Sequence, residues 1–121
     1  MIVFILMMSS LVFASEKATV NASEAMKYAG QTITVCDNVD DVKHFHDKGV
    51  YFVNFDGQWP DNKFTIVIWE RDAHIMQIDP VSEFLGKHVC VNEKIDTYNR
   101  KPQVTLTTDK NVTVSPRKIN E

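Results

Sequence analysis

Two histidines come closest to a metal-binding pattern in this sequence. His44 and His46 are two positions apart, so their imidazoles would lie on the same face of an extended strand. Asp40, Asp41 and Asp47 are close in sequence and carry carboxylates that could join a divalent cation site. Such pairs are common by chance, however, and the spacing fixes no third ligand. We therefore predict a solvated strand end and no metal site.

The sequence contains none of the short motifs that are typical of common enzyme classes. It has no Gly-x-Ser-x-Gly elbow, no phosphate-binding loop and no His-Glu-x-x-His zinc motif. A nucleophilic cysteine requires a free thiol, which Cys36 and Cys90 would lose if they paired with each other. We predict a protein without enzymatic activity and without a cofactor.

Length and composition predict one folded domain. The chain has 121 residues, of which 44% are hydrophobic and 24% are charged. This hydrophobic content is sufficient for a single core and too high for a disordered chain. Lys and Arg number 13 and Asp and Glu number 16, so the net charge is −3. That balance argues against a strongly basic nucleic-acid-binding module, but it is compatible with a local basic groove.

The first fourteen residues are predicted to be a signal peptide. Residues 1–14 read MIVFILMMSSLVFA, carry no charged side chain and are too few to span a bilayer, which needs about 20 residues. The small residues Ala14 and Ser15, followed by the charged Glu16, fit a signal-peptidase site. We expect a periplasmic or secreted mature chain, residues 15–121, without a stable membrane anchor. A buried N-terminal strand or helix and a retained anchor are the alternatives.

Export changes what the two cysteines imply. In an oxidising compartment, the even number of cysteines favours a disulfide bond between Cys36 and Cys90. The bond would close a loop of about 54 residues and stabilise the fold by roughly 3–4 kcal/mol. Two buried thiols that act as small apolar side chains are the alternative.

Hydrophobic periodicity and turn residues predict a mostly β chain. We expect a short helix over 23–30, capped by Ser23, and helical pieces over 70–85 that are interrupted at Pro80. Turn-forming residues predict a loop over 56–62. The predicted strands cover 31–35 with an extension to 45, 50–55, 63–69, 87–98 and 103–107, with Val112 and Val114 as a further extension of the sheet.

Three strands, a helical segment and two further strands follow the element order of the OB fold. Four segments strengthen the likeness, namely GQTITVCDNV (30–39), FTIVIW (64–69), LGKHVCVNEKI (85–95) and KPQV (101–104). On these segments the chain resembles an exported member of a bacterial OB-fold family related to nucleic-acid-binding domains. The resemblance covers a barrel of about residues 23–107 within a single OB-fold domain, residues 15–121.

The resemblance implies an all-β fold with small α content. The expected architecture is a five-stranded OB-fold Greek-key barrel, with a helical segment between strands three and four and a short N-terminal helix. In such a barrel the first and fourth strands are neighbours. That arrangement gives Cys36 and Cys90 a route to each other, provided that the register brings their Cβ atoms close.

The resemblance also implies a binding surface, because many OB-fold domains bind oligonucleotides on the sheet around their second and third strands. Aromatic side chains there would stack on bases, and basic side chains would contact phosphates. The implied ligand-binding residues are Tyr51, Phe55, Trp59, Trp69 and Tyr98 for stacking, and Lys63, Arg100 and Lys101 for phosphates. The open face of strand 50–55 is not decided, since both of its faces carry aromatic rings.

Two functional hypotheses remain open at this stage. The first is an exported OB-fold module that binds single-stranded DNA or RNA by aromatic stacking. The alternative is an envelope protein that binds a protein partner, a small ligand or a cation, without binding nucleic acid. A nuclease-like activity is disfavoured, because the sequence has no recognisable match to the catalytic segment of the staphylococcal-type nucleases, which also use an OB barrel.

Overall fold

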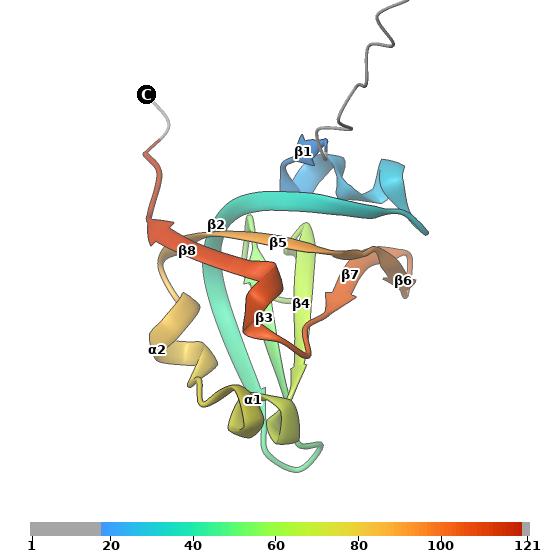
Figure 1. Ribbon diagram of the computed structural model, residues 1–121. Coiled ribbons are helices and arrows are strands. Elements are labelled where there is room, and N and C mark those ends of the chain that lie inside the picture. The colour runs from blue at the N-terminus through green and yellow to red at the C-terminus, as the bar shows by residue number, and fades with distance from the viewer. Residues whose placement is uncertain (1–17, 120–121) are drawn as a thin grey trace, which may run out of the picture.

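The structure, a computed structural model, describes residues 18–119, and these residues form a mostly β fold with short helices. The predicted signal peptide, residues 1–14, lies outside the described residues. No helix in the described range is long and apolar enough to cross a membrane. In chain order (Figure 1) the elements are β1 (Thr19–Val20), η1 (Ala22–Tyr28), β2 (Thr32–Phe45), β3 (Val50–Phe55), β4 (Phe64–Trp69), α1 (Glu70–Met76), α2 (Pro80–Phe84), β5 (Lys87–Lys94), β6 (Asp96–Tyr98), β7 (Lys101–Thr105), η2 (Asp109–Asn111) and β8 (Val112–Pro116).

The strands of the described range form one sheet, in the order β6-β7-β4-β3-β2-β5-β8, with β1 paired to β2 outside this path. The β4–β7 and β1–β2 pairings are parallel, and the others are antiparallel. The long strand β2 pairs with β5 through its first half and with β3 through its second half. Its register shifts between Val39 and Asp41, and Figure 1 shows the strand curving strongly along its length. A single strand thereby joins the two sides of the sheet.

The sheet has eight strands within the described residues, which differs from the predicted five-stranded barrel. The predicted fourth strand, 87–98, is divided into β5 and β6 at Ile95, whose side chain is fully buried. The unpredicted β1 pairs with β2, and β8 extends the sheet on the free edge of β5 around Val112 and Val114. These additions cover backbone edges that would otherwise be unpaired.

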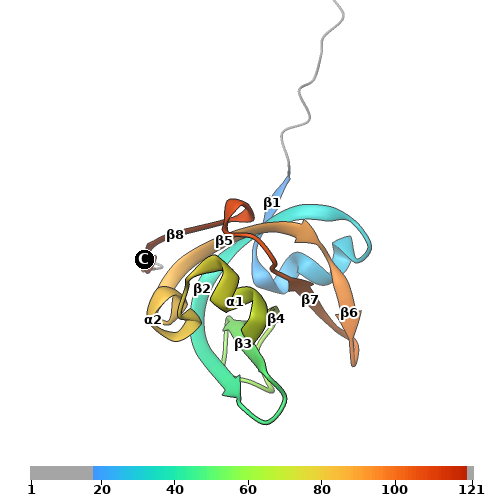
Figure 2. The same ribbon diagram turned by 60° about the horizontal axis from the view of Figure 1, so that its bottom comes forward.

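The hydrophobic core lies on the inner face of the sheet. Ile33 and Val35 of β2 both face it, as their alternation predicts. Ala25 of η1 and Ala73 of α1 belong to the same core. The two helices lie at opposite ends of the sheet in Figure 1, and α1 comes forward when its end is turned toward the viewer in Figure 2. The small alanine side chains let both helices pack closely against the sheet ends.

The N-terminal helix η1 is a 3₁₀ helix, and it begins earlier than predicted. Its cap is Asn21 rather than Ser23, because the Asn21 side chain accepts a hydrogen bond from the Glu24 backbone N–H at 3.1 Å. The Glu24 carboxylate accepts one from the Asn21 N–H in return, which completes a capping box. Farther along the chain, Pro80 separates α1 from α2 as predicted and occupies the first turn of α2.

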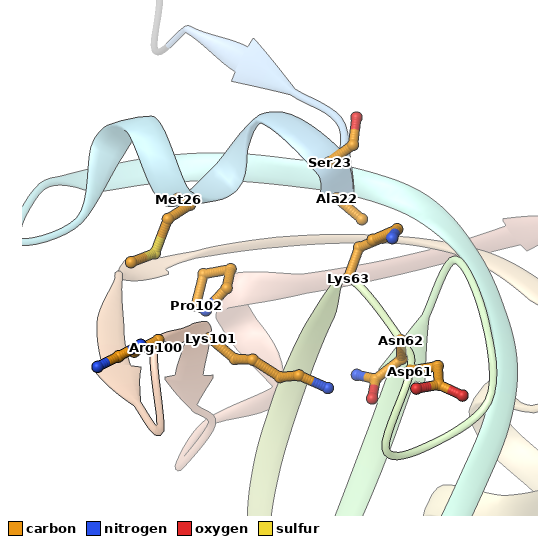
Figure 3. A pocket seen from close by; sticks show the side chains of 9 residues that line it. All are labelled: Ala22, Ser23, Met26, Asp61, Asn62, Lys63, Arg100, Lys101 and Pro102. Carbon is orange, nitrogen blue, oxygen red and sulfur yellow. The ribbon is translucent and has the colours of Figure 1, made fainter.

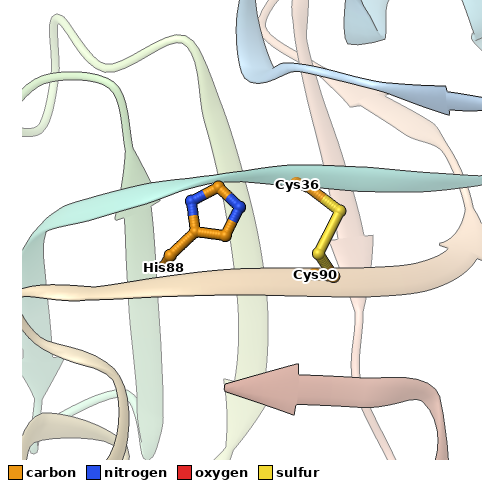
Figure 4. A group of neighbouring side chains, drawn as sticks. All are labelled: Cys36, His88 and Cys90. Carbon is orange, nitrogen blue, oxygen red and sulfur yellow. A yellow bond between two sulfur atoms is a disulfide. The ribbon is translucent and has the colours of Figure 1, made fainter. Parts of the chain in front are cut away.

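The predicted disulfide is confirmed. Cys36 and Cys90 are direct partners in the β2–β5 pairing and are bonded to each other, with their Cα atoms 4.1 Å apart. His88 lies beside the bond (Figure 4). Burial lowers the pKa of His88, the charge of Lys118 lowers it further, and the charge of Asp37 acts in the opposite direction. The disulfide thus fixes the first half of β2 against β5.

We predict that the Cys36→Ala/Cys90→Ala double variant loses about 3–4 kcal/mol of unfolding free energy, because the bond closes a loop between residues 54 positions apart. Urea unfolding of the variant and the wild type measures this difference. Reduced wild type serves as a control for the substitutions themselves and should unfold at the same urea concentration as the variant. Equal midpoints for oxidised wild type and the double variant would contradict the prediction.

Candidate ligand-binding site

Side-chain alternation along β3 separates two environments. Tyr51, Val53 and Phe55 point to the core side, whereas Phe52 and Asn54 point to the outer side of the sheet. Phe55 is fully buried. The prediction that Phe55 is a surface stacking residue is therefore corrected. Phe55 belongs to the core, where its ring packs edge-on against the buried Phe64 at 5.3 Å between centroids.

The outer face of β3, β4 and β7 carries aromatic side chains at its surface. The β3–β4 register places Phe52 opposite Val67, and Trp69 follows two positions later on the same face. Tyr98 of β6 is the register partner of Lys101 on β7. Trp69 is 46% exposed and Tyr98 is 64% exposed. We call this surface the outer groove, and its residues are Phe52, Trp59, Val67, Trp69, Tyr98 and Gln103.

The outer groove is hollowed by two adjoining cavities that share Phe52 in their lining. The larger, about 510 Å³, includes Trp69 and Lys48 in its lining, and the smaller, about 220 Å³, includes Trp59 and Lys101. Each cavity therefore combines an exposed indole ring with a lysine. Flat rings beside cations suit a ligand that has both aromatic faces and negative charge.

Trp59 reaches the outer groove from the β3–β4 loop, and it is 43% exposed. One side of its ring is supported by Phe45 of β2, which it meets edge-on at 5.6 Å between centroids. Phe45 in turn packs edge-on against Phe52 at 5.1 Å, and the Lys48 ammonium lies 5.9 Å from the centre of the Phe45 ring. The exposed indole thus belongs to an aromatic cluster that rests on the sheet.

Two neighbouring acids of β2 hold the β3–β4 loop in place. The buried carboxylate of Asp41 accepts hydrogen bonds from the Asn54 side-chain amide and from the Trp59 backbone N–H, both at 3.0 Å. Asp40 accepts one from the Gly57 backbone N–H at 2.8 Å. Backbone donors in the loop are thereby satisfied by fixed side chains, so the position of Trp59 is set by β2 and β3.

The same hydrogen-bond network continues through the end of the loop. The buried Asn62 amide donates to the Phe64 carbonyl at 2.9 Å and to the Thr65 hydroxyl at 2.7 Å. Thr65 donates to the Asn54 side chain at 2.9 Å. Gly57, with φ of 119°, lies so close to Asn62 that an added Cβ would be 3.3 Å from its Cα. Hydrogen bonds and close packing therefore hold the loop in one conformation.

The three basic residues predicted to contact phosphates lie together. Lys63, Arg100 and Lys101 line one cavity of about 370 Å³, and its acidic lining residue is Asp61. Figure 3 shows Lys101 extending toward Asp61 and Asn62 while Arg100 extends in the opposite direction. Lys101 also lines the smaller cavity of the outer groove. A basic surface therefore continues from the aromatic one.

Tyr51 lies on the other side of β3 and does not belong to the outer groove. Its ring stacks on His44, with 3.9 Å between ring centroids, and it lines a separate cavity with Glu70. Burial raises the pKa of the Tyr51 hydroxyl, and the negative charges of Asp79 and Glu70 raise it further. Its predicted place among the stacking residues is corrected, because it shares a face with Val53 and Phe55 rather than with Phe52.

Sequence reasoning missed Phe52, Phe45 and Lys48. A usable signal was nevertheless present in the neighbouring strand, where Thr65 shares a face with Trp69 while the opposite face is entirely apolar. Polar residues identify the solvent side of a half-buried strand. Because β3 pairs with β4, the same reasoning would have assigned Phe52 to the open face.

Comparison with known proteins shows a shared fold. No family model and no curated protein matches the chain. The structure "OBody AM1L10 bound to hen egg-white lysozyme" is 8% identical, with a TM-score of 0.57, and the match covers 79% of this chain and 91% of that chain. The Stn1–Ten1 complex of S. pombe, an OB-fold protein, is 16% identical with a TM-score of 0.51, covering 69% and 57%.

A Leishmania major protein classed as an aspartyl-tRNA synthetase is 9% identical, with a TM-score of 0.56. The match covers 90% of this chain but 22% of that protein, so the likeness extends over one part of a much longer chain. At these identities the comparisons establish similarity of fold with OB-type structures and leave the ligand to be argued from the site itself.

We predict that Asp41→Ala destabilises the protein by about 1–3 kcal/mol, because it leaves buried donors on Asn54 and Trp59 without their acceptor. It should also release the loop, so that Trp59 fluorescence shifts to longer wavelength. Urea unfolding and emission spectra in a Trp69→Phe background measure both effects. The control is Asp61→Ala in the same loop. An Asp41→Ala protein that matches this control in both measurements would contradict the role of the network.

Proposed function

We propose that this protein is an exported OB-fold binding module whose outer groove takes single-stranded nucleic acid. The observation that carries the proposal is the outer groove itself, where Trp59, Trp69 and Tyr98 expose rings around the Phe52 floor. Stacking of a base on such a ring contributes about 1–3 kcal/mol. Rings held by a sheet lose little conformational freedom when a ligand binds, which favours a useful net affinity.

We propose that β2, β3, β4, β7 and the combined β5–β6 correspond to the five strands of an OB barrel. Strands β5 and β6 lie at separate places in the pairing order, but only Ile95 separates them in the chain. The Ile95 N–H donates to the Gln31 carbonyl at 2.9 Å, and the Gly30 N–H donates to the Ile95 carbonyl at 2.7 Å. These bonds support one bent strand that links the edge at β7 with the edge at β2.

The charges around the outer groove support a polyanion as ligand. Lys48 and Lys101 line its two cavities, and Lys63 and Arg100 extend the basic surface beyond it. No ion pair within residues 18–119 engages any of these four side chains. Because the whole chain has a net charge of −3, we expect modest affinity that falls steeply as salt is added.

The compartment is part of the same proposal. The Cys36–Cys90 disulfide supports an oxidising environment, which fits a periplasmic or secreted protein. We propose that the module binds without catalysis. An oligonucleotide incubated with the protein and Ca²⁺ or Mg²⁺ should therefore keep its full length on a denaturing gel.

An envelope protein partner is the second candidate ligand, and one observation favours it. The larger cavity of the outer groove is bordered by Val50, Val67 and Trp69, which form an apolar area with few polar groups. Val50 and Val67 are nearly buried and Trp69 is exposed, and an exposed aromatic ring with apolar surroundings is typical of protein interfaces. A protein ligand of this type would bind with little dependence on salt, which separates the two candidates.

We predict that Trp69→Ala weakens binding of a labelled single-stranded oligothymidylate by about tenfold, because one stacking platform is lost. Fluorescence anisotropy at low and moderate salt measures the dissociation constant. Ile75→Ala, which removes an exposed apolar side chain from α1, is the control and should bind like wild type.

A matched charge pair extends this test. Lys101→Gln should weaken binding and reduce the salt dependence, whereas Lys110→Gln changes the net charge equally at an exposed position in η2 and should do neither. Failure of wild type to bind the oligonucleotide even at low salt would reject nucleic acid as the ligand and leave the protein partner as the candidate.

A further inference from the structure

We propose that His44, His46 and Glu70 form a binding site for a divalent transition-metal ion, for which Zn²⁺ is the best-suited probe. The site lies on the core side of the β2–β3 pairing, away from the outer groove, and the proposal does not depend on the function of that groove. One ligand atom from each of the three side chains lies within 4.8 Å of the others. We call these three residues the histidine cluster.

The atoms of the histidine cluster already converge. His44 Nε2 lies 2.7 Å from Glu70 Oε1, and His46 Nδ1 lies 4.0 Å from the same oxygen. The two imidazole rings are 3.6 Å apart between centroids. Ligands in a tetrahedral zinc site, with bonds of about 2.0–2.1 Å, are separated by about 3.4 Å from one another. Shifts of about an ångström would therefore convert the observed contacts into a coordination sphere.

Two of the three ligands are positioned by the fold. The His44 ring stacks almost parallel on Tyr51, with an interplanar angle of 12°, so its orientation is fixed by β3. Glu70 begins α1, and its backbone N–H donates to the Gly49 carbonyl at 2.9 Å, which ties it to the turn after β2. His46 is 82% exposed at its side chain and can adjust to an ion. This combination provides a fixed pair and an adaptable third ligand.

The surroundings of the histidine cluster leave room for further coordination. A cavity of about 440 Å³ is lined by the cluster and by His74. His74 is four positions after Glu70 on α1, and residues with this spacing lie on the same face of a helix. A fourth ligand position is therefore open toward water or the His74 imidazole.

The donor set also determines the class of metal. Two imidazoles and one carboxylate suit zinc, copper and nickel, whereas Mg²⁺ and Ca²⁺ prefer sites made of oxygen ligands alone. The sequence indicated the two histidines but no third ligand, and the prediction of no metal site followed from that gap. Glu70 is 24 positions after His46, and only the folding of α1 against the β2–β3 turn brings them together.

Calorimetric titration of the untagged mature protein with ZnCl₂ tests the proposal, because a polyhistidine tag would itself bind zinc. We expect one Zn²⁺ per chain and no comparable binding of Mg²⁺. His46→Ala and Glu70→Gln should each weaken zinc binding by at least about tenfold, and His46→Ala should remain folded because its side chain is exposed. His88→Gln, which changes a histidine beside the disulfide, is the control and should bind zinc as wild type does.

Cobalt substitution provides a second measurement that does not depend on heat. Co²⁺ bound in a tetrahedral site absorbs strongly in the visible range. We expect this absorption in wild type and His88→Gln, and we expect it to be lost in His46→Ala. The proposal is overturned if wild type binds no zinc, if zinc binding persists unchanged in both His46→Ala and Glu70→Gln, or if His88→Gln abolishes it.

Discussion

The candidate ligand-binding surface depends on the hydrogen bonds that the buried Asp41 carboxylate accepts. This carboxylate comes from the strand that curves between the two halves of the sheet, and it accepts hydrogen bonds from the side chain of β3 residue Asn54 and from the backbone of Trp59. A buried charge is stable only when such donors surround it. The donors therefore stabilise the Asp41 charge, and the charge in turn fixes the loop that carries the Trp59 indole ring.

Side-chain alternation along β3 places the outer groove on one face of the strand and the histidine cluster on the other. Phe52 forms the floor of the outer groove, while its neighbour Tyr51 faces the other side and supports the histidine cluster. Because the two residues belong to the same rigid strand, both sites are positioned by the pairing of β3 with β2 and β4. Sites built on strands hold their geometry more closely than sites built on loops.

Local patterns predicted most of the strands, because apolar alternation is a property of short segments. The disulfide between Cys36 and Cys90 was predicted on other grounds, namely the even number of cysteines and the expected oxidising compartment. The strand at 50–55 and the interruption at Pro80 are found as predicted. The predictions failed where distant segments meet. The division at Ile95 depends on hydrogen bonds to residues 30 and 31, and the assignment of Phe55 to the core depends on its packing with Phe64. A single strand with aromatic rings on both faces carries no internal signal of which face is buried.

Nuclear magnetic resonance mapping on ¹⁵N-labelled protein tests the central claim most directly, since it locates the ligand as well as detecting it. Titration with unlabelled single-stranded oligothymidylate at low salt should shift the indole N–H signals of Trp59 and Trp69 and the backbone signals of Phe52, Val67 and Tyr98. The signals around the disulfide should remain in place, and added salt should reverse the shifts. Absence of any shift, or shifts confined to residues outside the outer groove, would contradict the account.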